Sequence, residues 1–162
     1  IPMLLPLRVE IEQYLKDHPH LHTQIKEAPK HSYESIIQQI ELRFVDKSKN
    51  RKAGIHWANM GMYRKDIPFI FKAQDKIDFL TLLPKIIPKS ESTFWLLIET
   101  QGDKYWLYEG TLPAITEIIN HIGTSDFYIV SKKMEWLISE NHHDVWSFVG
   151  EKLKLSCLEE ST

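Results

Sequence analysis

Five consecutive polar residues at positions 140–144, with the sequence Glu-Asn-His-His-Asp, form the densest group of chemically capable side chains in the chain. Each of these side chains can hold a proton, a metal ion or a hydrogen-bond partner. The run directly follows an apolar stretch at 136–139. Three uses are open: a metal site, general acid–base catalysis, or a corner locked by its own side chains that contacts a partner.

Metal binding by this run meets a geometric objection. His142 and His143 are adjacent, so on a strand they point to opposite faces and share an ion only if a turn intervenes. Zinc sites with a recognised spacing use a second Cys or His pair, which the sequence lacks. Three more histidines, His18, His20 and His22, would share one side of an extended backbone. A solvated loop after a helix is the alternative there, and we expect no metal and no cofactor.

General acid–base catalysis would use a histidine that titrates near neutral pH, oriented by Glu140 or Asp144. A small hydrolase or phosphoesterase built on His142 and His143 is therefore one hypothesis. Against it, the sequence contains no nucleophile elbow, no Gly-rich phosphate loop and no Cys in a nucleophile position. We favour a non-enzymatic protein in which Asn141 and Asp144 lock a corner by hydrogen-bonding to nearby backbone groups.

The second half of the chain predicts an antiparallel sheet that positions this run. A continuous apolar stretch at 94–98 is typical of a central strand covered on both faces, and an aromatic strand returns after a turn at 100–103. Thr111 is expected to cap a helix that ends near Gly123. The expected order is strand, strand, helix, strand, strand, strand, at residues 94–98, 104–109, 112–122, 127–130, 136–139 and 145–149.

The first 90 residues are predicted to be mainly helical. A helix is expected over 6–17, a second from a cap at Ser32 to Phe44, and a third from a cap at Asp75 that ends or kinks at Pro84. The expected fold class is α+β in a single domain, 1–162. An antiparallel sheet of about five strands in the C-terminal half, 91–150, would pack against the N-terminal helices and one crossover helix.

Composition and charge argue against a disulfide-bonded, membrane-spanning or secreted protein. The chain has 162 residues, is 43% hydrophobic and has one cysteine, Cys157, so it can form no intramolecular disulfide. No apolar run approaches the roughly 20 residues that span a bilayer, and the N-terminus lacks a basic signal-peptide region. We expect a cytoplasmic protein without a membrane partner. Residues 1–90 hold 15 Lys and Arg against 10 Asp and Glu, a balance of +5, whereas residues 91–162 hold 5 against 12, a balance of −7.

The segment 46–65 admits two interpretations. Its first part, 46–52, is basic, but a short charged run is ordinarily a solvated loop, so we expect no nucleic-acid partner. Its second part, 53–65, has two glycines, two methionines and large aromatics without clear periodicity. Such a segment forms part of a binding face, or tucks against the core with Trp57 as its anchor.

The order of several motifs resembles a group of small bacterial proteins of unknown function. The resemblance covers residues 93–150, and its most specific part is the run 140–144 after Trp136-Leu137. The other motifs are Phe94-Trp95, Tyr105-Trp-Leu-Tyr-Glu109 and Tyr128-Ile-Val-Ser-Lys-Lys133. Several small α+β proteins of this kind act as immunity proteins beside polymorphic or contact-dependent toxins. The resemblance implies a fold and a toxin-neutralising role, and supplies no catalytic mechanism.

The expected function is therefore that of an immunity protein that occludes the active site of a cognate toxin domain. Many antibacterial toxins are nucleases with basic clefts, and an inhibitor of such a cleft needs acidic groups and rigid aromatic anchors. The expected contacts in the acidic half are Asp103, Glu109, Glu135, Glu140, Asn141, His142, His143 and Asp144. Secondary contacts are expected from Trp57, Tyr63 and Arg64.

Overall fold

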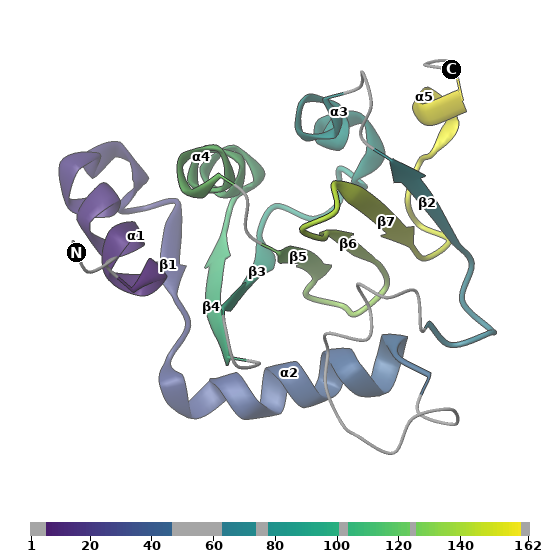
Figure 1. Ribbon diagram of the computed structural model, residues 1–162, viewed down its shortest axis with the longest axis horizontal. Coiled ribbons are helices and arrows are strands. Elements are labelled where there is room, and N and C mark those ends of the chain that lie inside the picture. The colour runs from purple at the N-terminus through teal and green to yellow at the C-terminus, as the bar shows by residue number, and fades with distance from the viewer. Residues whose placement is uncertain (1–5, 47–62, 74–77, 101–103, 124–125, 160–162) are drawn as a thin grey trace.

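One antiparallel sheet organises the chain in the computed structural model, which describes residues 6–46, 63–73, 78–100, 104–123 and 126–159. Its strands lie in the order β1-β4-β3-β5-β6-β7-β2 (Figure 1). The strands are β1 Ile25–Glu27, β2 Phe69–Ala73, β3 Phe94–Thr100, β4 Lys104–Gly110, β5 Phe127–Ser131, β6 Leu137–Glu140 and β7 Val145–Val149. The helices are α1 Leu7–Asp17, the 3₁₀ turn η1 Pro19–Leu21, α2 Lys30–Phe44, α3 Phe79–Ile86, α4 Leu112–Ile122 and α5 Ser156–Glu159.

The sheet has seven strands, where the sequence predicted about five. The five predicted strands of the C-terminal half are present as β3 to β7 and occupy the centre of the sheet. The first half of the chain adds β1 beside β4 and β2 beside β7, at the two edges. These strands have only three and five residues, so side-chain alternation gives a weak signal for them.

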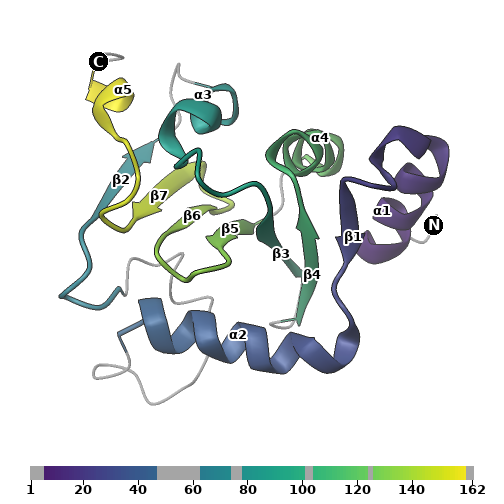
Figure 2. The same cartoon turned by 180° about the vertical axis from the view of Figure 1, so that it is seen from behind.

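Helices cover both faces of the sheet. Helix α2 crosses one face, and α1, α3, α4 and α5 lie on the opposite face (Figures 1 and 2). Strand β3 shows the consequence, because Leu96 and Ile98 belong to the core beneath α3 and α4, whereas Leu97 belongs to the core beneath α2. The prediction of a central strand covered on both faces is therefore confirmed. Within the described ranges, no helix combines the length and apolar character that a bilayer crossing requires.

The helix boundaries correct two of the predictions. Helix α2 begins at Lys30 after Pro29, two residues before the predicted cap at Ser32. The cap of α3 is Asp78, whose carboxylate accepts a hydrogen bond from the backbone N–H of Leu80. The predicted cap, Asp75, lies outside the described residues, and Pro84 lies inside α3 without ending it. Helix α4 follows its prediction, with its cap at Thr111 and its end at a left-handed Gly123.

One carboxylate, that of Glu91, holds the turn between β5 and β6 by two hydrogen bonds. Glu91, in the connection before β3, accepts hydrogen bonds from the indole Nε1 of Trp136 at 2.7 Å and the hydroxyl of Ser131 at 2.6 Å. Trp136 is fully buried and packs against Phe94 with ring centroids 5.5 Å apart. Because the buried indole N–H has this acceptor, the large aromatic ring can occupy the core without losing a hydrogen bond.

Replacing Glu91 with alanine should therefore destabilise the fold by about 1–3 kcal/mol, because it leaves a buried indole N–H without its acceptor. Urea unfolding monitored by tryptophan fluorescence measures this loss directly. Glu151→Ala, which removes an exposed carboxylate, is the matched control and should leave the midpoint within error. Equal midpoints for the two variants would show that Glu91 does not support the Trp136 corner.

Candidate functional site

The predicted polar run forms a tight turn between β6 and β7. The side-chain oxygen of Asn141 accepts hydrogen bonds from the backbone N–H of His143 at 2.9 Å and of Val145 at 3.2 Å. The backbone N–H of Asn141 also donates to the carbonyl of Val145. Asp144 adopts a left-handed backbone with φ 58°, a conformation that Asp tolerates better than most residues. The structure therefore contains the expected corner, with the side chain of Asn141 as its lock, whereas Asp144 contributes through its backbone conformation and through its N–H, which donates to the carbonyl of Asn141.

The two histidines of this turn lie on its surface. Their ring centroids are 4.0 Å apart, and Nδ1 of His142 lies 3.3 Å from a carboxylate oxygen of Asp126. The side chain of His142 is 65% exposed. The histidine–carboxylate pair that acid–base chemistry requires therefore exists, but its carboxylate is Asp126, and the sequence had suggested Glu140 or Asp144.

Four carboxylates gather around this turn. Burial raises the pKa of Glu140, the nearby charges of Asp144, Asp126 and Asp78 raise it further, and a hydrogen bond from Trp146 opposes the rise. The four carboxylates come from three places in the chain: the β6–β7 turn, the residue before β5 and the cap of α3. We call Asp78, Asp126, Glu140 and Asp144 the acidic end of the sheet. The negative charges of the three aspartates oppose the ionisation of Glu140, in addition to the effect of its burial.

The raised pKa of Glu140 predicts a pH-dependent gain in stability for Glu140→Gln. A carboxyl whose pKa is higher in the folded state holds its proton more tightly there, so folded stability falls as the pH rises and the group ionises. The neutral amide avoids this loss and should stabilise the protein near pH 7 by less than about 1 kcal/mol. The gain should shrink as the pH falls towards 4.5, the ordinary pKa of the group. Thermal unfolding at several pH values tests it, and a destabilised variant at pH 7 would contradict the assignment.

The other predicted contacts lie elsewhere. Glu109 lies near the opposite end of the strands, where it pairs with Lys26 at 3.1 Å and Lys132 at 2.6 Å. Glu135 is in the turn before β6, also at that end, and lines a cavity of about 190 Å³. Of the predicted contacts that the structure describes, it brings together only residues 140–144, and it adds Asp126 and Asp78.

Two further predicted contacts come from the chain before β2. Arg64 is exposed and forms an ion pair with Asp66 at 3.1 Å. Tyr63 is only 4% exposed and packs in the core beneath α2, so its ring is not offered to a partner. Trp57 and Asp103 lie outside the described residues.

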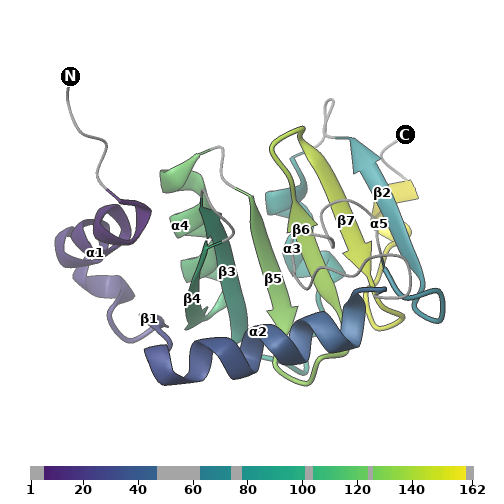
Figure 3. The same cartoon turned by 60° about the horizontal axis from the view of Figure 1, so that its bottom comes forward.

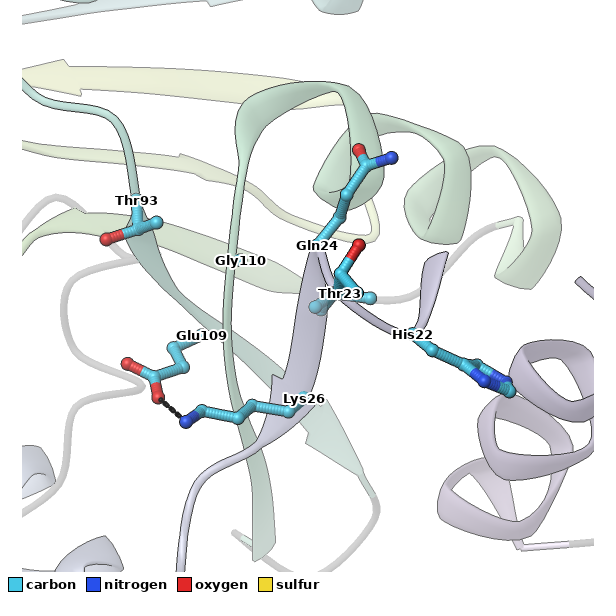
Figure 4. Close-up of a pocket in the computed structure, with 8 residues that line it drawn as sticks. His22, Thr23, Gln24, Lys26, Thr93, Glu109 and Gly110 are labelled. Atoms are coloured by element: carbon cyan, nitrogen blue, oxygen red, sulfur yellow. Dashed lines mark ion pairs between the residues drawn. The ribbon is translucent and has the colours of Figure 1, made fainter. Parts of the chain in front are cut away.

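A cavity of about 510 Å³ lies beside β1, at the far end from the polar turn (Figure 4). Gly110 is one of its lining residues, and the ion pair between Lys26 and Glu109 lies at one side of it. The hydrogen bond from the ammonium group of Lys132 lowers the pKa of Glu109, burial opposes it, and the hydrogen bond from Lys26 and the charges of both lysines lower the pKa further. Glu109 is therefore not a free negative charge, and this part of the surface differs from the acidic end.

The histidines at 18–22 do not lie along an extended strand. The segment 18–22 follows α1 and contains the 3₁₀ turn η1. Nδ1 of His18 lies 2.8 Å from the carbonyl oxygen of Tyr14, and Nε2 of His22 lies 2.7 Å from that of Leu15. These contacts satisfy carbonyls of the last turn of α1, which is the ordinary need of a helix end. Among the residues that the structure describes, no group of three His, Cys, Asp or Glu side chains is placed to hold a metal ion.

The chain matches a known protein family over most of its length. Residues 3–160 match the model of a family described as "Family of unknown function (DUF6756)". No curated protein and no solved structure shows significant similarity to the chain.

Proposed function

The chain belongs to a family of unknown function, DUF6756. We propose that it is an immunity protein that binds and neutralises a cognate bacterial toxin. The bound surface is the acidic end of the sheet, and the toxin is one with a basic active-site cleft, such as a nuclease. The protein acts without catalysis, in the cytoplasm that such a toxin would attack.

The observation that carries this proposal is the convergence of four carboxylates on one rigid turn. Three separate segments supply them, and the charges raise the pKa of Glu140. Charges held close together in the free protein gain most when a partner of opposite sign covers them, because repulsion is then replaced by attraction. A basic phosphate-binding cleft is such a partner, and its phosphate pocket accepts carboxylates.

The turn also has the rigidity that a binding surface needs. Asn141 locks its backbone, and the buried aromatic ring of Trp146 packs beneath it against Phe127 and Phe148. A surface that is already ordered loses little conformational entropy on binding. Because Trp146 is buried, recognition at this end rests on charge and hydrogen bonding more than on an aromatic anchor.

The product of the gene beside the one that encodes this protein is the natural probe. Purified separately, the two proteins should form a complex whose affinity falls with added salt, since opposite charges meet in the interface. The neighbouring protein's toxic activity should be lost in the complex.

The competing hypothesis is a hydrolase that uses His142 with a carboxylate, and it makes a distinct prediction. Under the inhibitor proposal, the protein alone turns over neither RNA nor a chromogenic phosphodiester. Turnover that His142→Ala or His143→Ala abolishes would overturn the inhibitor proposal and support the hydrolase.

A further inference from the structure

Strand β2 forms an open edge of the sheet. In the described part of the chain it pairs only with β7, and Figure 3 shows it as the outermost strand on that side. The backbone N–H of Gly150 donates to the carbonyl of Pro68 at 2.8 Å, and Phe69 lies opposite Val149. Because antiparallel pairs alternate, the backbone groups of Phe69 and Phe71 point away from β7. No strand among the described residues pairs with them.

Apolar side chains flank this edge on both faces. Phe69 and Phe71 are 37% and 44% exposed, and their ring centroids lie 5.1 Å apart. On the other face, Ile70 and Lys72 line a cavity of about 540 Å³ together with Leu155 and Leu158, and Phe71 borders the same cavity at the edge. An edge with exposed aromatic rings on one face and an apolar hollow on the other suits an incoming strand whose side chains alternate between the two faces.

One charge in the cavity indicates the chemistry of that strand. Lys72 is half-buried in the otherwise apolar lining, and among the described residues no carboxylate lies within ion-pair distance of its ammonium group. A partly buried cation gains most from a carboxylate that the partner supplies. The complementary segment is therefore apolar, extended and carries an acidic residue beside Lys72.

We propose that β2 is a docking edge for an extended segment of a partner protein, which adds to the sheet as a further strand and places a carboxylate beside Lys72. Main-chain hydrogen bonds at Phe69 and Phe71 supply the pairing, and Lys72 supplies the preference for an acidic residue. This surface does not depend on the toxin-inhibitor proposal, because its partner is recognised by backbone and by a positive charge.

A peptide pair tests this proposal. The probe is acetyl-Thr-Val-Thr-Val-Glu-Val-Thr-Val-Thr-amide, and its control carries Lys in place of Glu; the symmetric pattern allows either strand direction. Titrated into the ¹⁵N-labelled full chain, the acidic peptide should shift the amides of Phe69 and Phe71 and bind at least about tenfold more tightly than the basic one. Lys72→Glu should reverse the preference, whereas Lys26→Glu at the other edge should leave it unchanged.

Three results would overturn the proposal. One is that neither peptide shifts the two amides at about 1 mM, the weakest binding that such a docking edge could use. Another is that both peptides bind equally, which removes the role of Lys72. The third is that Lys72→Glu promotes self-association of the protein without any gain in peptide binding, because Lys72 would then guard the edge against pairing.

Discussion

Gly150→Ala is expected to destabilise the protein by about 3 kcal/mol or more, the largest effect of any single methyl group that the structure indicates. Gly150 follows β7 and has φ 115°, a conformation that L side chains rarely adopt. An added Cβ would lie 2.5 Å from the carbonyl oxygen of Glu135 and 3.0 Å from Cα and Cβ of Trp136. These atoms are backbone or part of a buried tryptophan, so they cannot move aside cheaply.

Gly123→Ala is the matched control for this prediction. Gly123 also has a positive φ, 74°, but its Cβ would meet no heavy atom within 4 Å. It should therefore show the backbone strain alone, about 1–2 kcal/mol. Urea unfolding of both variants separates strain from the close approach. Equal losses of stability would mean that the contact between Gly150 and Trp136 does not constrain the end of β7.

Neutralising the acidic end should weaken toxin binding by about 30-fold or more, since opposite charges in a desolvated interface couple strongly. The variant is Glu140→Gln with Asp144→Asn, which keeps side-chain shape and keeps a residue type that tolerates the left-handed backbone at 144. Because the neutral amide avoids the cost of ionising a partly buried carboxyl near other negative charges, Glu140→Gln should stabilise the protein at neutral pH, so weaker binding could not be blamed on unfolding.

The control for the charge change is Glu34→Gln with Glu151→Gln. Both carboxylates are exposed and neither belongs to the acidic end, while the net charge changes by the same amount. Isothermal titration calorimetry against the product of the neighbouring gene measures both variants. If both bind as tightly as the unmodified protein, the toxin does not recognise the acidic end. If both lose affinity equally, attraction depends on net charge alone.

The sequence predicted those parts of the fold that local signals determine. Helix α4 carried a capping threonine, an apolar stripe and a terminal glycine, and β7 was bounded by Asp144 and Gly150. Strands β1 and β2 were missed because they are short and gain their stability from pairing with β4 and β7. Pro84 did not end α3, because the apolar face of that helix is held by buried contacts, including Phe79 and Ile86.

The residues of the candidate site were likewise predicted only in part. The turn at 140–144 was found from residue types alone, because Asn and Asp in sequence favour locked corners. Its companions Asp126 and Asp78 were not, since only the tertiary fold brings the residue before β5 and the cap of α3 to the same place. Conversely, Glu109 was expected to contact a partner protein, but it is paired with lysines from two other segments. Exposure and pairing of a carboxylate depend on distant residues that no local pattern reveals.

Hydrogen–deuterium exchange of the complex with the neighbouring gene's product tests the central claim most directly. The account predicts that binding slows exchange at residues 140–145 and at the start of β5, while peptides from α2 exchange as in the free protein. A footprint confined to other parts of the chain, or no complex at all between the two purified proteins, would contradict the account.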